Sequence, residues 1–317
     1  MMFRKIFTLA LGAAVVFGLG FGAAQAQEFP EKPITLILPL GAGGSHDRNA
    51  RVFTSTIPTY LGNAIIVKLM PGASGQTGTA AAAAAKPDGY TLLFTHNYFD
   101  QLQQHVVNLP YDTNKDFISV AQLNSNDASF IVRSDSPFNS LADLVDHAKA
   151  NPGTLKFAHS GVWGAVHVPA VRFFKEAGID VTLVPYKGGG PAMAGFLSGD
   201  SDFTMQFPST ILGQGDKVRV LASGSEGLFE GVPSFGELGY TADIGSMRRI
   251  IMAPSGIPAD RLAKIQDALV AMQDDKTYKR LIKAIGENLN FVNGPEYEEL
   301  RPGQSVAFKE LIESLAQ

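Results

Sequence analysis

The stretch that decides the fold is Pro39-Leu40-Gly41-Ala42-Gly43-Gly44-Ser45-His46-Asp47, a glycine-rich loop between two regular segments. The run before it, Ile34 to Leu38, has the aliphatic and β-branched composition of a buried strand. After it, apolar residues recur at helical spacing until Gly62. Ser45 is expected to cap this helix, and Pro58 to kink its last turn. The stretch therefore predicts a strand, a loop and a helix of an α/β fold.

The same order of strand, loop and helix recurs along the chain. Further strands are predicted over residues 65–69, 91–95, 155–159 and 181–184. Glycine-rich loops, Ser160 to His167 and Lys187 to Pro191, follow the last two, and Pro191 is expected at a first helical position. Alternating strands and helices are typical of βαβ units. The sequence thus predicts two α/β domains, each a mostly parallel sheet flanked by helices.

The first 26 residues have the pattern of a signal peptide. Arg4 and Lys5 precede an apolar, glycine-rich run from Ile6 to about Ala23, and Ala24-Gln25-Ala26 matches a cleavage site. A retained membrane anchor is the alternative, which the glycines in the run disfavour. Cleavage would remove 26 of 317 residues and leave 291 from Gln27 on, enough for two domains. We therefore expect secretion to the periplasm.

Composition excludes several classes of protein. The chain has no cysteine, which excludes disulfides, thiolate metal sites and a cysteine nucleophile. Loss of Arg4 and Lys5 with the leader would take the net charge from −4 to −6, and no run of five or more basic residues occurs. We therefore expect no nucleic-acid partner.

Motifs of common enzymes are also missing. The sequence contains no G-x-S-x-G, no P-loop and no H-E-x-x-H. Gly41 to His46 begins like a dinucleotide-binding fingerprint but has His46 where the third glycine belongs. No metal or cofactor is expected, although a metal assembled from distant parts of the fold stays open as an alternative. The six histidines, which show no metal-ligand spacing, are His46, His96, His105, His147, His159 and His167.

The three glycine-rich loops are the segments that carry chemistry. Ligands of open α/β sheets bind at the carboxyl ends of the strands. Exposed backbone N–H groups at a helix N-terminus can hold a carboxylate without Arg or Lys. The alternative is that the glycines only make tight turns. Three equivalent loops favour a shared site for a carboxylate or another anion.

Candidate ligand-binding residues come from these loops and the segments beside them. Ser45 and Ser160 offer hydroxyls, Trp163 offers a stacking surface or packs on a satellite core, and Lys187 either neutralises a second acidic group or is solvated. Tyr98 forms an opposite wall or packs beneath the loop. The full set is Gly43, Gly44, Ser45, His46, Asp47, Tyr98, Ser160, Gly161, Val162, Trp163, Gly164, His167, Lys187, Gln206 and Phe207.

Several motifs, taken in order, resemble the tripartite tricarboxylate transporter solute-binding family, also called Bug receptors. The resemblance covers essentially the whole mature chain. Its motifs are Pro39 to Asp47, Pro71-Gly72-Ala73-Ser74-Gly75, Lys86-Pro87-Asp88-Gly89-Tyr90, Leu109-Pro110-Tyr111-Asp112, Val184-Pro185-Tyr186-Lys187-Gly188, Val232-Pro233-Ser234-Phe235 and Ala253-Pro254-Ser255-Gly256-Ile257-Pro258.

The resemblance implies a two-domain periplasmic-binding-protein fold of the Venus-flytrap type. After the signal peptide, residues 1–26, it implies a discontinuous first domain of residues 27–123 and 247–317, and a second domain of residues 124–246. It also implies a monomeric, non-enzymatic receptor that grips a carboxylate with backbone amides of two loops and delivers it to membrane permease subunits. An exported α/β enzyme acting on an organic acid, and a ligand-dependent sensor, stay open as alternatives.

Three positions depart from the family pattern. His46 stands where the family usually has Thr, and Val162-Trp163 replace small polar residues. Gln206 occupies a position where amino-acid and hydroxy-acid binders often carry Asp. Without that carboxylate a ligand ammonium would lack its partner charge. The departures therefore favour an aromatic or otherwise partly apolar acid over an amino acid.

Overall fold

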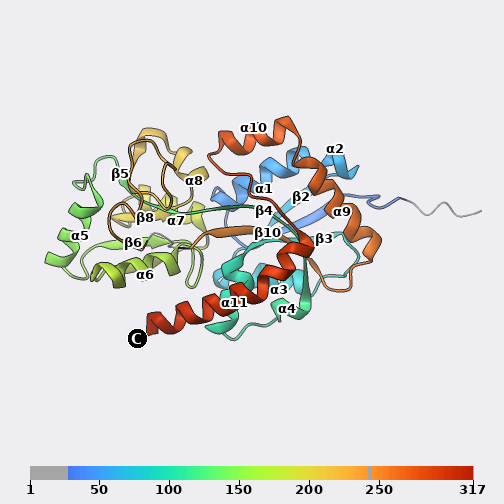
Figure 1. Cartoon of the computed structure of the whole chain (residues 1–317), viewed down its shortest axis with the longest axis horizontal. Coiled ribbons are helices and arrows are strands. Elements are labelled where there is room, and N and C mark those ends of the chain that lie inside the picture. Colours follow the sequence, from blue (N-terminus) through green and yellow to red (C-terminus); the bar gives the residue numbers. More distant parts are fainter. Residues whose placement is uncertain (1–27, 242–244, 317) are drawn as a thin grey trace, which may run out of the picture.

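The chain folds into two lobes that lie side by side (Figure 1). The structure is a computed structural model, and it describes residues 28–241 and 245–316. The predicted signal peptide, residues 1–26, lies outside the described residues. Within the described ranges no helix is both long and apolar enough to cross a membrane.

The first lobe is built on a six-stranded sheet. β1 pairs in parallel with β2 and β3, whereas β10 runs antiparallel to β3 and β4, and β11 antiparallel to β4. The strand order is β11 (Val292–Asn293), β4 (Phe117–Asn126), β10 (Met247–Pro254), β3 (Thr91–His96), β1 (Ile34–Leu38) and β2 (Ile65–Leu69).

Helices cover both faces of this sheet because its strands are apolar on both sides. Along β1, Leu36 and Leu38 are buried in one core and Ile37 in another, on the opposite face. The first face carries α1 (Ser45–Thr56), α2 (Pro58–Leu61), α9 (Ala259–Met272) and α10 (Lys276–Ala284) (Figure 1). The second face carries α3 (Gln76–Ala83), α4 (Thr113–Asp116) and the start of α11 (Gly294–Ala316).

The second lobe is a five-stranded sheet with the same layering. Its order is β7 (Thr182–Pro185), β6 (Lys156–His159), β8 (Phe203–Gln206), β5 (Ser129–Arg133) and β9 (Val218–Ala222). A phenylalanine-rich core packs α5 (Leu141–Ala150) and α6 (His167–Ala177) on one face. The other face carries α7 (Gly189–Leu197) and α8 (Pro208–Leu212).

Two strands and one helix tie the lobes together. β4 and β10 belong to the first sheet, and the whole second sheet is formed by the chain between them. α11 begins under the first sheet, and its last turns reach the second lobe, where Phe308 and Leu311 pack against the phenylalanine-rich core (Figure 1). The predicted domain boundaries stay a prediction, and the first of them, 123/124, falls inside β4.

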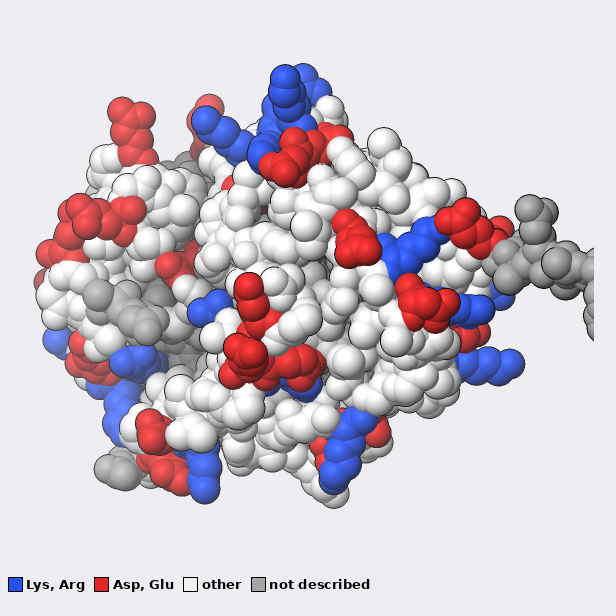
Figure 2. All heavy atoms as spheres, turned by 45° about the vertical axis from the view of Figure 1, so that its right-hand side comes forward, with Lys and Arg blue, Asp and Glu red and all other residues white. Residues whose placement is uncertain are grey.

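Short helical segments complete the described fold, and charge is spread over its surface. These segments are η1 (Ala73–Gly75), η2 (Tyr98–Leu102), η3 (Gln103–His105) and η4 (Gly215–Lys217). Figure 2 shows side chains of both signs across the visible face, with cations gathered at the top over α10. The exposed cations of α10 are Lys276, Lys279, Arg280 and Lys283.

The sequence-based expectations for local structure are mostly confirmed. The two-lobed α/β architecture, the strands at 34–38 and 65–69, the break of the first helix before Pro58 and its end at Gly62 are as predicted. The sheets are mixed rather than mostly parallel, because β10 and β5 run antiparallel to both of their neighbours. Pro191 is the third residue of α7, not the first.

A fully buried ion pair lies where the lobes join. Arg249 of β10 and Glu287, which follows α10, have side chains inaccessible to solvent, and two guanidinium nitrogens reach the carboxylate at 2.6 and 3.1 Å. Glu287 also accepts hydrogen bonds from Asn126 of β4 and Ser209 of α8. A buried charge is tolerated only when it is paired and hydrogen-bonded. This pair therefore holds parts of both lobes in one geometry.

We predict that Glu287→Gln lowers the free energy of unfolding by about 3–5 kcal/mol, because the Arg249 charge would be left buried without its counterion. Urea unfolding followed by circular dichroism measures the change. Lys279→Gln is the matched control, since it removes an exposed ion pair with Asp274 (3.2 Å) and is expected to leave the midpoint unchanged. Equal midpoints for wild type and Glu287→Gln would contradict the structural role of the pair.

Candidate functional site

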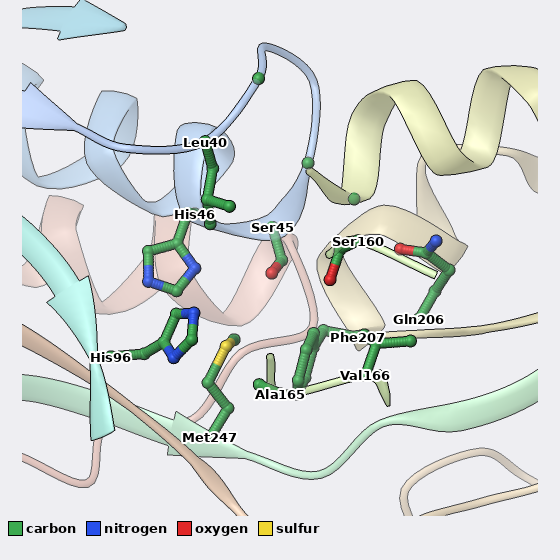
Figure 3. A pocket seen from close by; sticks show the side chains of 13 residues that line it. Leu40, Ser45, His46, His96, Ser160, Ala165, Val166, Gln206, Phe207 and Met247 are labelled. Atoms are coloured by element: carbon green, nitrogen blue, oxygen red, sulfur yellow. The ribbon is translucent and has the colours of Figure 1, made fainter. Parts of the chain in front are cut away.

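A pocket lies between the two lobes, at the carboxyl ends of β1, β3, β6 and β8. Its cavity volume is about 20 Å³, and all the empty space in and around it, open solvent included, is about 370 Å³. Figure 3 shows the side chains converging on it from both lobes. The lining residues are Leu40, Gly41, Gly44, Ser45, His46, His96, Ser160, Ala165, Val166, Gly189, Gln206, Phe207 and Met247.

Helix N-termini converge on this pocket. Gly44 is the N-cap of α1, Val166 the N-cap of α6, and Gly189 the first residue of α7. None of these three helices has a side-chain hydrogen bond at its cap, which is also true of α3, α8 and α9, whereas α5 and α10 are capped by Ser140 and Asp275. First-turn N–H groups without a side-chain acceptor, at the positive end of a helix dipole, form a ready site for an anion.

Two glycine loops bring the backbones of the two lobes into direct contact. The Gly41 N–H donates to the carbonyl of Lys187 at 2.9 Å. A Cβ added to Gly190 would lie 1.9 Å from the Ala42 oxygen, and one added to Gly44 would lie 2.9 Å from the Gly190 nitrogen. No side chain larger than hydrogen fits between these backbones. Glycine at these positions therefore allows α1 and α7 to begin next to one another.

Neutral polar groups and apolar side chains make up the rest of the lining. In Figure 3 the hydroxyls of Ser45 and Ser160 point into the pocket from opposite lobes. The expected capping role of Ser45 is wrong, because Ser45 is the first helical residue and Gly44 takes the cap position. Gln206 is anchored by its amide nitrogen, which donates to the Thr204 hydroxyl at 3.2 Å.

Two imidazoles in edge-to-face contact form one wall of the pocket. The rings of His46 and His96 have centroids 5.1 Å apart and lie one above the other in Figure 3. His46 Nε2 is 3.1 Å from the Thr95 carbonyl oxygen, and His96 Nδ1 accepts from the Phe99 N–H at 3.4 Å. Burial, reinforced by the charge of Arg249, lowers the pKa of His46 to about 3. Burial and the neighbouring His46 hold the pKa of His96 well below its usual value. Both rings are therefore neutral at physiological pH.

Six of the fifteen residues predicted from the sequence line this pocket: Gly44, Ser45, His46, Ser160, Gln206 and Phe207. The other nine do not. Asp47 turns back on its own loop, where its carboxylate accepts from the Gly43 N–H at 2.9 Å and pairs with Arg51 at 3.0 Å. The Lys187 side chain is exposed, and only its carbonyl takes part, through the bond to Gly41.

The aromatic residues predicted for the cleft contact other parts of the protein and do not line the pocket. Tyr98 is buried, and its hydroxyl donates to the Gly245 carbonyl at 3.3 Å. Trp163 packs against the core of the second lobe, with its ring 5.6 Å from that of His167. The His167 ring lies 4.8 Å from that of His159 at a tilt of 51°, which makes a second buried imidazole pair outside the lining. The Ser160 loop curls over itself here, because Trp163 and Gly161 both have positive φ.

The remaining predicted residues of that loop also lie outside the lining. Val162 is exposed, Gly161 sits against Ser74 of the first lobe, and Gly164 lies beside the Gly161 carbonyl. Lining residues that were not singled out are Leu40, Gly41, His96, Ala165, Val166, Gly189 and Met247. His96 could have been predicted as a lining residue, because it directly follows the predicted strand 91–95 and the pocket lies at the carboxyl ends of the strands. Met247 has no signal in the sequence, because only the pairing of β10 with β4 and β3 brings it here.

Among the described residues, no group of three or more His, Asp or Glu is placed to hold a metal ion. Residues 49–316 match the protein family described as "Tripartite tricarboxylate transporter family receptor". The chain belongs to this family. It is therefore a receptor of the periplasmic solute-binding type, and its resemblance to Bug receptors is confirmed.

Individual relatives agree with the family. A protein of Agrobacterium vitis named "UPF0065 protein in the TAR-I ttuE-ttuC' intergenic region" is 33% identical over 81% of this chain and 76% of its own. The structure of the periplasmic binding protein BugD is 26% identical, with a TM-score of 0.85 over 91% of this chain and 99% of that one. A protein of R. palustris solved with adipate shares the fold, with a TM-score of 0.86 at 20% identity over 91% and 99% of the chains.

We predict that His46→Gln flattens the pH dependence of stability in acid. The pKa of His46 falls from 6.5 to about 3 on folding, so between these values the unfolded chain binds a proton that the folded protein does not. Stability from this group is present above pH 6.5 and is lost as the pH falls, by up to about 1.4 kcal/mol per pH unit. Urea unfolding at pH 7, 6 and 5 measures the slope. Identical slopes for wild type and variant would contradict the burial of a neutral imidazole.

Proposed function

We propose that this receptor is secreted to the periplasm by cleavage of its first 26 residues and captures a small organic acid between its lobes. It then delivers the acid to the membrane permease subunits of a tripartite tricarboxylate-type transporter. In this proposal residues 27–123 and 247–317 form one jaw and residues 124–246 the other. Family membership supports the transport role, and the pocket supports the class of ligand.

The convergence of uncapped helix N-termini is the observation that carries this proposal. α1 comes from the first lobe and α6 and α7 from the second, so an anion held by their N–H groups would contact both lobes at once. Such a ligand stabilises the arrangement in which the lobes touch, because it loses the donors of one lobe when they separate. A carboxylate suits the site, since Ser45 and Ser160 add hydroxyl donors from opposite lobes.

The pocket does not favour an enzyme. Within the described part of the chain, neither the Ser45 nor the Ser160 hydroxyl is hydrogen-bonded to a histidine, so neither has a base to activate it. His46 has a pKa of about 3, which makes its imidazole a weak base at neutral pH. A binding role needs neither group to react. A sensor would use the same liganded form, and pull-down of permease subunits with and without ligand separates the two roles.

We predict that at least one organic acid raises the melting temperature of the mature protein, because a ligand that binds only the folded state stabilises it. A thermal-shift screen of mono-, di- and tricarboxylates, aliphatic and aromatic, measures this. The same screen on Gly190→Ala should show a shift reduced at least about twofold, since a methyl group there would lie 1.9 Å from the Ala42 oxygen and force the lobes apart.

Gly303→Ala is the matched control for this experiment. Gly303 lies in α11, and a Cβ added to it meets nothing within 4 Å, so its ligand response should equal that of wild type. Absence of any shift with all acids at millimolar concentration would overturn the proposed function. A full response in Gly190→Ala would show that the acid binds elsewhere than between the glycine loops.

A further inference from the structure

The first half of α11, residues 294–302, is fixed to the first lobe by a buried arginine. Arg301 Nε and Nη2 donate to the Asp100 carboxylate at 3.1 and 2.8 Å, and Nη1 pairs with Glu298 at 3.0 Å. Nη2 also donates to the Thr113 carbonyl at 2.6 Å. Arg301 and Asp100 are both buried, and breaking a buried pair leaves a charge without its counterion. This half of the helix therefore stays with the first lobe.

The second half of α11, residues 303–316, contacts the second lobe less firmly. Its apolar side chains at helical spacing pack against the phenylalanine-rich core of that lobe, and they are Phe308, Leu311, Ile312 and Leu315. Of the described residues 302–316 none is buried, in contrast to the inward-facing residues of the first half, Gly294, Tyr297 and Arg301. On the surface, Lys175 Nζ of α6 donates to the Ser314 carbonyl at 2.8 Å. Partly buried side chains gain only part of the free energy of a core residue, so this contact can part while both lobes stay folded.

Pro302 separates the two halves. It lies inside the helix and has no N–H to donate to the Glu298 carbonyl four residues before it. Its ring also crowds that carbonyl, and a helix bends most readily at such a position. The second half can therefore change direction while Arg301 keeps the first half in place.

The second half of α11 contacts both lobes at once. The ring of Phe308 lies 4.9 Å from that of Tyr98 in the first lobe, and the same side chain packs against the core of the second. In Figure 1 the helix runs from below the first sheet to the second lobe, where its end lies below α6. None of the described residues 303–316 lines the pocket. This contact therefore depends on how the lobes lie relative to each other and needs no contact with a ligand.

We propose that residues 303–316 hold the lobes together and part from the second lobe when the lobes separate. A bound acid leaves only from the separated arrangement, so a contact that exists only while the lobes touch slows its release. Residues 303–316 thus set the residence time of the acid without touching it, and Phe308 is the side chain that bridges the lobes. The effect on the acid rests on the proposed function, whereas the parting of the helix needs no ligand.

Labelling of a single cysteine tests the parting without any ligand. The chain contains no cysteine, so Ile312→Cys introduces one thiol, at a partly buried position against the second lobe. Gly190→Ala forces the lobes apart at the glycine loops. It should speed the reaction of this thiol with N-ethylmaleimide at least about fivefold, because a covered thiol reacts when its cover opens. Small-angle X-ray scattering of the same samples records the separation of the lobes as a larger radius of gyration.

Ala148→Cys is the matched control. Ala148 is buried in the core of the second lobe, so its thiol should react slowly and at the same rate with and without Gly190→Ala. A larger radius of gyration with an unchanged Ile312→Cys rate would overturn the inference, since the helix would then stay on the second lobe while the lobes separate. If Gly190→Ala leaves the radius unchanged, or speeds the reaction of Ala148→Cys as well, the rates of acid release decide.

Release of a bound acid provides the second arm. Phe308→Ala should raise the dissociation rate of radiolabelled succinate, or of a tighter acid from the thermal-shift screen, at least about fivefold while the association rate changes less than about twofold. Phe308→Leu keeps an apolar side chain and should stay within about twofold of wild type. Val306→Ala changes an exposed residue of the same helix and should equal wild type.

The two arms separate this inference from the proposed function. An unchanged dissociation rate in Phe308→Ala would contradict the inference even if the melting temperature of the variant falls, because a merely structural role lowers stability without speeding release. If no acid binds at all, the proposed function fails, and the labelling rates of Ile312→Cys decide on the helix alone.

Discussion

The rest of the site depends on a close approach of two backbones. The loop after β1 and the loop before α7 touch through Gly41, Gly44 and Gly190, where a methyl group would collide with the facing main chain. Because nothing but hydrogen fits there, the N-termini of α1 and α7 lie next to each other although they belong to different lobes. The site is thus made of main-chain groups that neither lobe could bring together alone.

A neutral lining follows from this way of holding an anion. Under the proposed function, helix N-termini and hydroxyls supply the positive potential that holds the carboxylate, so that role needs no lysine or arginine. The positive charge of Arg249 is buried with Glu287 behind the wall and serves to lock β10, β4 and α8. The histidines beside it stay uncharged because they are desolvated and face that cation. In this region the buried charges hold the lobes in place, and the helix dipoles face the pocket.

Much of the fold could be predicted from the sequence, because hydrophobic runs, glycine loops and the break at Pro58 are local signals. The predicted loops do border the pocket. Which side chains line the pocket was harder to predict. Trp163 and Lys187 were both predicted to contact a ligand. In the structure the curl of the Ser160 loop packs Trp163 against the core of the second lobe, and Lys187 contacts the first lobe through its carbonyl, which accepts from Gly41. His96 and Met247 reach the pocket through strand pairings between distant segments. No local pattern encodes such a pairing.

The claim that backbone amides rather than charged side chains hold the ligand can be measured by nuclear magnetic resonance. Deuterated, ¹⁵N-labelled protein would be titrated with hexanoate, or with the tightest acid of the screen, and amide proton shifts followed. The account predicts downfield shifts, as expected for N–H groups that donate to a carboxylate, at Gly44, Ser45 and Gly189 in both lobes together. Unchanged amides at these positions, with the largest changes at lysine or arginine side chains, would contradict it.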